Sequence, residues 1–259
     1  MAGYLLVQIS DVHLPAGPEL MPGVRPRDNL VHGLDLLAST GLRPDVLLLT
    51  GDLADAGDGA SYDDLAGILA EAAGRYGARV IYLPGNHDDR DTFRRHLLGT
   101  DGSGPVNQTV WLDGLRIIAL DSTVPGEDYG QLDQDSLGYL RAELSRPAPS
   151  GTVLAMHHPP VSSPIVRATE LQLRQTGQLR DAIAGSDVRL ILCGHYHHAA
   201  LGTLGTVPVW VSPATSYLLD PASTGTFRQV AGAAFSRVDL TDDGPTVTVL
   251  PIPVGRPGK

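Results

Sequence analysis

Cysteine is almost absent from this chain of 259 residues, which contains only Cys193. A single thiol cannot form an internal disulfide and cannot build a cysteine-based zinc site, so both kinds of framework are excluded. Long apolar runs are absent as well. The run Tyr4–Ile9 near the start of the chain is far too short for a secretory signal or a membrane span. We therefore expect a soluble, cytoplasmic protein that has no membrane partner.

Positive charge is scarce too. The chain has 19 Lys and Arg residues against 29 Asp and Glu residues, so its formal net charge is −10. An extended basic face, which a protein needs to bind a nucleic-acid polymer, is therefore not expected. A local site could still bind a small anion.

The remaining composition is that of a globular protein. Hydrophobic residues make up 42% of the chain and charged residues 19%, which argues against a disordered chain. The 30 Gly and 20 Pro residues follow no repeating period, so collagen is excluded and many turns are predicted. The length suits one large domain, and no segment has the length and composition of an interdomain linker. We predict a single domain over residues 1–259.

Short aliphatic or β-branched runs recur along the chain, and each ends in a polar cluster. Runs this short and this apolar predict strands that are buried on both faces. They are Tyr4–Ile9, Val46–Thr50, Arg79–Leu83, Thr152–Met156 and Val188–Cys193.

Helical patterns lie between these runs. Apolar residues at helical spacing predict helices at 28–39, 61–76 and 134–144, with Ser61 as the cap of the second, and a weaker pattern predicts a helix at 171–183. Strands that alternate with helices predict an α/β fold.

A hairpin interrupts this alternation. The runs Val106–Leu112 and Leu115–Asp121 are joined by Asp113-Gly114, a pair that suits a tight hairpin turn. The segment from Ala199 to Ile252 also consists mostly of strand-like runs. The sheets are therefore expected to be mixed rather than purely parallel.

The residues that follow the predicted strands are nearly all of metal-ligating types. Because strand ends point into one crevice in α/β folds, these side chains are expected to converge. A set rich in nitrogen and oxygen that shares a carboxylate suits two cations, which lie about 3.5–4 Å apart in phosphoryl-transfer sites. The candidates are Asp11, His13, Asp52, Asn86, His157, His195 and His197.

The order of these motifs resembles the calcineurin-like metallophosphoesterase superfamily. The motifs are Asp11-Val12-His13, Gly51-Asp52, Gly85-Asn86-His87-Asp88, His157 and Gly194-His195-Tyr196-His197. Three more segments resemble the class III cyclic nucleotide phosphodiesterases and the related glycerophosphodiesterases. They are 120–126, 156–161 and 214–217.

This resemblance implies a fold and a metal centre. The fold would be a four-layer α/β/β/α sandwich with two mixed β-sheets. Asp11, His13 and His197 would hold one metal, Asn86, His157 and His195 the other, and Asp52 would bridge both. The metals would be iron, manganese or zinc, since oxygen and imidazole ligands are compatible with each.

The resemblance also implies the chemistry. A hydroxide held between the two metals would attack phosphorus. His87 would hydrogen-bond a phosphoryl oxygen or protonate the leaving group, and Asp88 could orient His87 or a ligand. Relatives of this kind often pair, so a homodimer is expected.

The leading hypothesis is an enzyme that hydrolyses small phosphodiesters, most of all 3′,5′-cyclic nucleotides such as cAMP. Alternatives are a glycerophosphodiester phosphodiesterase or a phosphodiesterase and phosphomonoesterase of broad specificity. A non-catalytic scaffold with the same fold is the alternative from another class. It would be expected to lack ligands, and none is missing here.

Several polar residues near the motifs have less certain roles. Strand alternation would place His195 and His197 on one face, whereas only one of His157 and His158 would face the metals. His158 is expected either to be structural or to support a metal ligand from behind. Tyr217 could line the pocket, and the segment 121–123 could approach the site or serve as a turn. The histidines outside the motifs, His32, His96 and His198, are expected at the surface.

Overall fold

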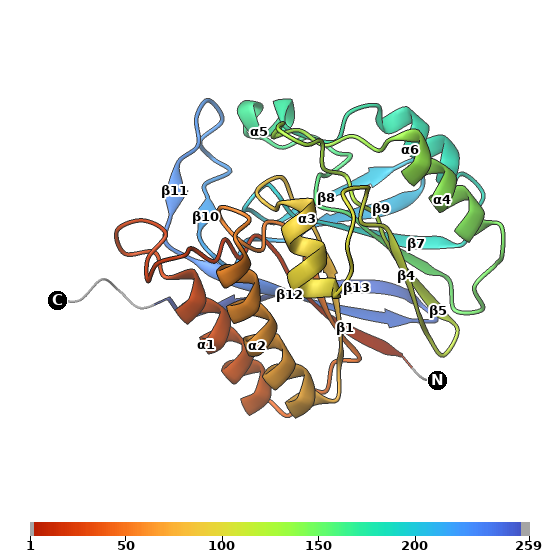
Figure 1. Ribbon diagram of the computed structural model, residues 1–259. Coiled ribbons are helices and arrows are strands. Elements are labelled where there is room, and N and C mark those ends of the chain that lie inside the picture. Colours follow the sequence, from red (N-terminus) through yellow and green to blue (C-terminus); the bar gives the residue numbers. More distant parts are fainter. Residues whose placement is uncertain (1–2, 255–259) are drawn as a thin grey trace.

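A computed structural model describes residues 3–254 and places two sheets face to face, with helices on both outer sides (Figure 1). The described elements are β1 (Tyr4–Ile9), α1 (Pro26–Ser39), β2 (Val46–Thr50), α2 (Gly59–Tyr76), β3 (Arg79–Leu83), α3 (Arg90–Phe93), the π-helical turn η1 (Arg94–Leu98), β4 (Gln108–Leu112), β5 (Leu115–Ala119), α4 (Gln134–Leu144), β6 (Thr152–Ala155), α5 (Val166–Glu170), α6 (Thr176–Ile183), β7 (Val188–Cys193), β8 (Ala200–Leu204), β9 (Val207–Val211), β10 (Leu218–Leu219), β11 (Gln229–Val230), β12 (Ala233–Thr241) and β13 (Gly244–Ile252).

Both large sheets are mixed, as predicted. The first has the strand order β13-β12-β1-β2-β3. In it β1, β2 and β3 are parallel to one another, whereas β12 is antiparallel to both of its neighbours, β1 and β13. The second has the order β4-β5-β6-β7-β9-β8, with β5, β6, β7 and β9 parallel and antiparallel strands at both edges. Strands β10 and β11 form a separate two-stranded hairpin.

Alternating side chains of the central strands divide the core into three apolar layers. In β2, Leu47 and Leu49 pack with helices α1 and α2, whereas Val46 and Leu48 pack against the second sheet. In β6, Leu154 packs with helices α4, α5 and α6. A strand that is apolar on both faces therefore lies between two cores, which explains its continuous apolar run. The four-layer α/β/β/α sandwich is confirmed.

The strand predictions agree closely with the structure. Four of the five apolar runs have the predicted bounds, and β6 ends one residue early, at Ala155. The predicted hairpin is confirmed as β4 and β5, with Asp113 and Gly114 both at positive φ in its turn. No helix among residues 3–254 is long and apolar enough to cross a membrane.

The predicted cap of the second helix was wrong. Helix α2 begins at Gly59, and its cap is Asp58, whose carboxylate accepts hydrogen bonds from the amide and the hydroxyl of Ser61 at 3.0 and 2.7 Å. Ser61 therefore lies in the first turn. A carboxylate at the cap also interacts favourably with the helix dipole.

The helix predicted at 171–183 is also wrong in its first half. The structure has the short helix α5 before this segment and α6 only from Thr176. Between them, the amide of Leu173 donates to the carbonyl of Pro159 at 3.0 Å, and the amide of Arg174 donates to the carbonyl of Gly130. These tertiary hydrogen bonds use the backbone groups that a continuous helix would need.

An ion pair between the buried Arg116 and Asp187 stabilises the second sheet. The Arg116 side chain is fully buried and donates to both carboxylate oxygens of Asp187, at 2.8 and 3.1 Å. Burial alone would raise the pKa of Asp187. Hydrogen bonds from Ala148 and Thr152 and the charge of Arg116 outweigh that effect and lower the pKa below its usual 3.8.

Replacing Asp187 by Asn is expected to reduce the free energy of unfolding by about 3 kcal/mol, because the buried Arg116 loses its counter-charge. Since the folded state lowers the pKa of Asp187, its contribution is present above about pH 4 and is lost as the pH falls further. The wild type and the variant should therefore converge in stability in acid. Urea unfolding at pH 7 and pH 3 measures this, with the exposed Asp181→Asn as control. A pH-independent difference would contradict it.

Candidate metal centre

The seven predicted ligands lie where parallel strands end. Asp11 and His13 follow β1, Asp52 follows β2, and Asn86 follows β3. From the second sheet, the segments after β6 and β7 bring the remaining histidines to the same edge. Neighbouring parallel strands end at the same edge of a sheet, so residues that follow different strands and lie far apart in the sequence meet there.

The backbone at this edge is unusual. Five of the seven candidates have a left-handed conformation, with φ between 47° and 73°. Each such conformation costs a non-glycine residue about 1–2 kcal/mol, so the surrounding structure must impose it. They are Asp11, His13, Asp52, His195 and His197.

Hydrogen bonds between the loops impose this conformation. The amide of His13 donates to the carbonyl of Asp52 at 2.8 Å, and the amide of Asp11 donates to the carbonyl of Gly51 at 3.1 Å. Both carboxylate oxygens of Asp11 accept from the amide of His195 at 3.0 Å. The two sheets are therefore joined through the candidate ligands themselves.

One group of candidate ligands consists of Asp11, His13, Asp52 and His197. Each offers a ligand atom within 4.8 Å of the others. The Nε2 atoms of His13 and His197 are 3.2 Å apart, and His197 Nε2 is 3.5 Å from Asp11 Oδ1. Two ring nitrogens that face each other beside two carboxylates are a donor set that fits a divalent cation.

A second group lies beside the first. His157 Nε2 is 3.2 Å from His195 Nδ1. The Oδ1 atom of Asn86 is buried and has no hydrogen-bond partner within residues 3–254. An unpaired buried oxygen is costly, so a cation that accepts it as a ligand would relieve that cost. Both groups therefore fit metal ions.

Asp52 joins the two groups through one oxygen. Its Oδ2 atom is 3.4 Å from Nε2 of His13 and 3.3 Å from Nε2 of His157. Its other oxygen, Oδ1, accepts a hydrogen bond from the amide of His87 at 3.0 Å. The carboxylate is thus held by one oxygen while the other lies between both groups.

The far nitrogen of most of these imidazoles is already bound. Nδ1 of His157 donates to the carbonyl of Thr50 at 2.8 Å, and Nδ1 of His197 donates to the carbonyl of Tyr217 at 3.0 Å. Nδ1 of His13 pairs with the carboxylate of Asp55 at 3.2 Å. These partners set the tautomer and leave Nε2 free to bind a metal.

The packed charges shift several pKa values. Burial raises the pKa of Asp11 to about 6, although the charge of His157 opposes the shift. Burial would lower the pKa of His157, but attraction to Asp52 outweighs it and raises the pKa to about 9. Burial and the charge of His157 lower the pKa of His195 to about 3. Metal binding requires deprotonated imidazole nitrogens, so a cation bound here would compete with protons for these histidines.

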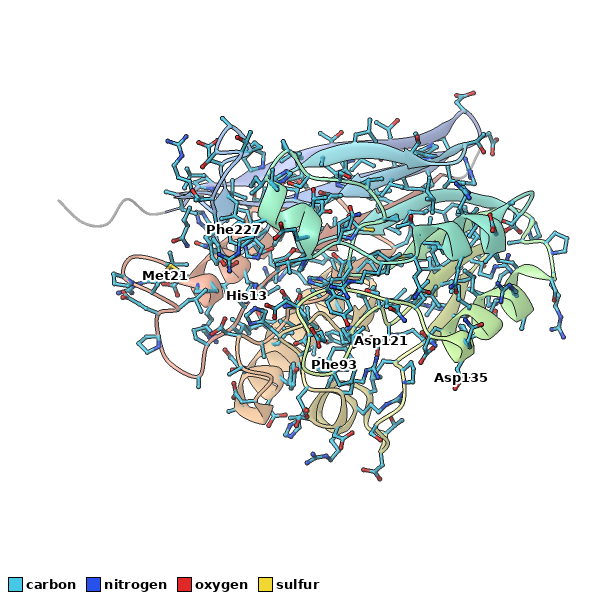
Figure 2. The ribbon with its side chains drawn as sticks, turned by 90° about the horizontal axis from the view of Figure 1, so that it is seen from above. His13, Met21, Phe93, Asp121, Asp135 and Phe227 are labelled. Carbon is cyan, nitrogen blue, oxygen red and sulfur yellow. The ribbon has the colours of Figure 1, made fainter. Side chains whose placement is uncertain are left out.

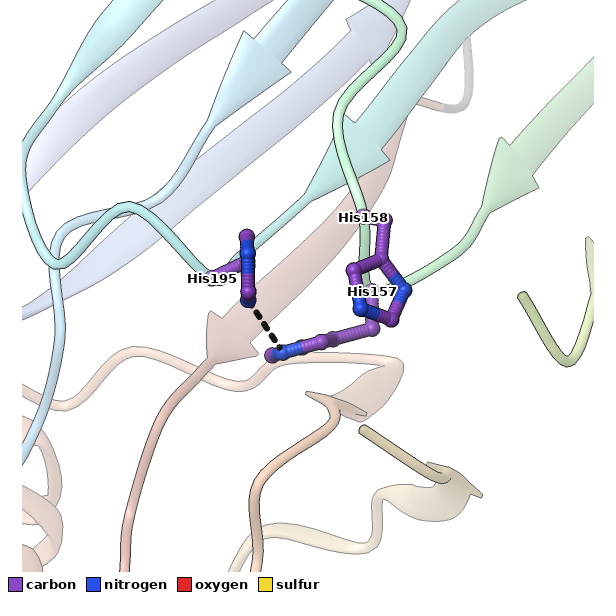
Figure 3. A group of neighbouring side chains, drawn as sticks. All are labelled: His157, His158 and His195. Carbon is purple, nitrogen blue, oxygen red and sulfur yellow. Dashed lines mark hydrogen bonds between the residues drawn. The ribbon is translucent and has the colours of Figure 1, made fainter. Parts of the chain in front are cut away.

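His158 lies closer to the second group than the sequence suggests. The rings of His157, His158 and His195 each offer a ligand atom within 4.8 Å of the others (Figure 3). Nδ1 of His158 pairs with the hydroxyl of Ser122 at 2.9 Å, whereas its Nε2 is buried without a partner within residues 3–254. His158 is therefore a further candidate ligand that strand alternation did not predict.

His195 and His197 do not lie on an extended strand. Strand β7 ends at Cys193, and both histidines have left-handed φ values of 73° and 53° in the turn that follows. The amide of Tyr196 donates to the carbonyl of Gly194 at 2.9 Å, which tightens this turn. The two imidazoles consequently face different groups of ligands, one each.

His87 lies at the open side of the site. Its side chain is 41% exposed, and its Nδ1 atom donates to the backbone carbonyl of Asp55 at 2.8 Å. The ring packs edge-on against His13, with 4.6 Å between the centroids. Asp55 thus contacts both rings, a role that the sequence analysis missed although Asp55 follows Asp52 by three residues.

Of the two roles predicted for Asp88, the first, orienting His87, is not what the structure shows. Its buried carboxylate accepts hydrogen bonds from the amides of Leu53, Ala54 and Gly85 and from the hydroxyl of Tyr62. It therefore holds the loop after β2 against the loop after β3. Those loops carry Asp52 and Asn86.

Other predicted neighbours of the site lie behind it. Asp121 forms a 2.8 Å ion pair with Arg90 and serves the turn rather than the metal groups. His198 was expected at the surface but is buried, and its Nε2 pairs with the hydroxyl of Ser163 at 2.8 Å. Burial of this histidine is possible because the hydroxyl satisfies the ring nitrogen. His32 is exposed and His96 is half-buried.

A pocket of about 330 Å³ opens above the candidate ligands. Its floor contains His13, Asp52, Asn86, His195 and His197, with His87 at the side. Its walls are mostly apolar. Of their residues only Tyr217 was predicted to line the pocket, because the walls consist of loops and short elements without periodic patterns. They include Met21, Ala168, Leu171, Tyr217, Leu219 and Phe227, and Figure 2 shows Met21 and Phe227 on the same side of the molecule as His13.

Glycine at position 85 is required by close packing. A Cβ atom there would overlap Oδ1 and the backbone nitrogen of Asp52. Gly85→Ala is therefore expected to displace Asp52 and to lower metal affinity about 10–100-fold, as loss of a supporting contact typically does. Gly74→Ala is a matched control, because no atom lies within 4 Å of that Cβ. Metal titration of both variants is the measurement, and equal affinities would contradict this packing argument.

Comparisons with known proteins find a matching family model and several similar sequences. A family model described as calcineurin-like phosphoesterase matches residues 4–199. A Rhodococcus erythropolis protein named "Probable cyclic nucleotide phosphodiesterase" is 45% identical over 218 residues, which cover 84% of this chain and 72% of that protein. A cAMP/cGMP dual specificity phosphodiesterase of Mycobacterium tuberculosis is 40% identical over 253 residues, which cover 96% of this chain and 80% of that protein.

The fold also resembles a solved enzyme structure. A dimetal phosphatase from Danio rerio superposes with a TM-score of 0.68 and covers 97% of this chain and 99% of its own. The two sequences are 15% identical, so this likeness concerns the fold alone.

Proposed function

Because this chain belongs to the calcineurin-like phosphoesterase family, we propose that it hydrolyses small phosphodiesters and that 3′,5′-cyclic nucleotides such as cAMP are its substrates. Two relatives at 40% and 45% identity bear names of cyclic nucleotide phosphodiesterases. The observation that carries the proposal is the position of Asp52 Oδ2, 3.4 and 3.3 Å from a histidine of each ligand group. One shared carboxylate between two sets of ligands is an arrangement that suits a pair of cations.

We propose the ligand assignment that the sequence motifs imply. Asp11, His13 and His197 would hold one metal, and Asp52 would be shared. The second metal would be held by Asn86, His157 and His195. When bound, two such cations lower the pKa of water to about 7 and stabilise negative charge on phosphoryl oxygens. Iron, manganese and zinc all accept these ligands.

His87 would act on the substrate directly. The bond from its Nδ1 to the carbonyl of Asp55 leaves Nε2 for a proton or a hydrogen bond at the substrate. Because the ring lies at the wall of the pocket, it can reach the leaving oxygen or a phosphoryl oxygen of a bound diester.

Two further points of the proposal concern the protein as a whole. We propose a homodimer, which the resemblance to related enzymes implies, and a cytoplasmic location, which the single cysteine and the short apolar runs of the sequence favour. Light scattering of the purified protein measures the first, and fractionation of the source cells measures the second. A monomer at micromolar concentration would argue against the dimer.

The test of the proposed function is a ranking of substrates. The purified protein, supplied separately with iron, manganese and zinc, is incubated with cAMP, a glycerophosphodiester and bis(p-nitrophenyl) phosphate. We expect kcat/KM to be highest for cAMP and activity to disappear with a chelator. Higher kcat/KM for the glycerophosphodiester would favour that alternative substrate class. No hydrolysis of any ester with any metal would leave the scaffold alternative.

A further inference from the structure

We propose that Phe227 is a specificity-determining residue that contacts the base of a nucleotide substrate. This inference rests on the proposed function and adds the part of the pocket that distinguishes nucleotides from other diesters. It starts from the walls of the pocket rather than from its metal-ligating floor.

Phe227 is exposed where the other phenylalanines are not. Phe93 and Phe235 are buried to 0% and 1% exposure in the core, whereas Phe227 is 42% exposed. Exposed large apolar side chains elsewhere in residues 3–254, such as Leu201 and Val166, do not line the pocket. An aromatic ring left open on a pocket wall is typical of a ligand contact.

The segment that carries Phe227 is held in place. It connects β10 to β11, and the carbonyl of Thr224 accepts a hydrogen bond from the amide of Val166 at 3.0 Å, at the start of α5. Within the connection, the amide of Asp220 donates to the carbonyl of Arg228 at 2.8 Å, and their side chains form an ion pair. In Figure 1, this hairpin and α5 extend beyond the sheets on the same side of the molecule.

A cation also packs on the ring. The Arg167 guanidinium lies 5.4 Å from the centroid of the Phe227 ring. Arg167 does not line the pocket, so this contact supports the ring from outside the pocket. A supported ring loses less conformational freedom when a ligand binds, which favours affinity.

Most of the other wall residues are apolar as well, although Asp128 and Gln229 also line the pocket. Met21 comes from the loop between β1 and α1, Leu171 follows α5, and Leu219 lies in β10. The pocket is therefore polar at the floor and mostly apolar at the walls. A cyclic nucleotide has the matching polarity, since it carries an anionic phosphodiester at one end and a flat aromatic base at the other.

A simple diester lacks the second part of this match. A glycerophosphodiester offers hydroxyl groups where the nucleotide offers a base, and the side chains of Met21 and Phe227 give a hydroxyl group no strong hydrogen-bond partner. Substitution by alanine of an aromatic side chain that stacks on a base typically weakens binding by about five- to 150-fold, equivalent to about 1–3 kcal/mol.

The experiment compares Phe227→Ala with the wild type on two substrates. For cAMP, kcat/KM is expected to fall about tenfold or more, mostly through a higher KM. For methyl p-nitrophenyl phosphate, which has no base, kcat/KM is expected to change less than twofold. Phe227→Trp should retain most of the activity on cAMP, because it retains an aromatic face. Val230→Ala, an apolar truncation in the same hairpin outside this pocket, is the control.

A binding measurement gives an independent result. Calorimetry with metal-loaded wild type should show tighter binding of AMP than of ribose 5-phosphate, and this ratio should approach one in Phe227→Ala. An equal loss on both substrates would assign Phe227 to the stability of the site and overturn the inference. Unchanged kinetics on both would overturn it as well. If the wild type cleaves the simple diester but not cAMP, the proposed function itself fails. This outcome is visible in the wild type alone and is therefore distinct from a failure of the inference about Phe227.

Discussion

Replacement of Asp52 by Ala is expected to reduce turnover of every diester substrate by at least about a thousandfold. Loss of a single preorganised group that stabilises the transition state already costs about a hundred- to a thousandfold. The loss of Asp52 is expected to cost more than that, because its Oδ2 atom serves both ligand groups: it lies 3.4 Å from Nε2 of His13 and 3.3 Å from Nε2 of His157. Its removal would leave both proposed cations short of a ligand. Metal content should therefore fall along with turnover.

The control for this variant must retain the fold. Asp64→Ala removes a partly exposed carboxylate of α2 that pairs with Arg27 at the surface, so its metal content and turnover should equal those of the wild type. Thermal unfolding of the variants identifies any loss of structure. A folded Asp52→Ala protein with near-normal turnover would contradict the shared-carboxylate mechanism.

Replacement of His87 by Ala is expected to lower kcat for cAMP by about a hundred- to ten-thousandfold, the usual range for loss of an acid or base. Metal content should be retained, because the ring faces the pocket and its Nδ1 is bound to the carbonyl of Asp55. Measurement of kcat and bound metal on the same sample tests both expectations. Equal losses of metal and kcat would mean that His87 supports the ligands and does not act on the substrate.

The leaving group distinguishes the two possible roles of His87. An alkoxide needs a proton as it leaves, whereas p-nitrophenolate leaves without one. If His87 protonates the leaving group, the His87→Ala variant should lose far less activity on bis(p-nitrophenyl) phosphate than on cAMP. If His87 instead binds a phosphoryl oxygen, both substrates should be affected to a similar extent.

The sequence predicted the sheets and the convergence of the site because both depend on local patterns. Apolar runs as short as Val46–Thr50 indicate strands buried on both faces, and the structure confirms such strands between two cores. Convergence follows from strand direction, so Asp11 and Asp52 could be expected to meet. The mixed sheets are confirmed, and so is the membership of the phosphoesterase family, which the resemblance of the motifs implied.

The parts that could not be predicted depend on contacts between distant segments. The left-handed turn at His195 and His197 replaces a predicted strand, because hydrogen bonds from other loops hold it. The walls at Met21 and Phe227 come from loops, where sequence patterns carry no information about the pocket that they border. The break before α6 likewise results from backbone hydrogen bonds to Pro159 and Gly130.

The central claim is that two cations share Asp52, and anomalous scattering from crystals of the metal-loaded protein tests it most directly. We expect two peaks about 3.5–4 Å apart, each within ligand distance of Asp52 Oδ2. One peak should lie beside His13 and His197, and the other beside His157 and His195. A single peak, or two peaks of which only one contacts Asp52, would contradict the claim.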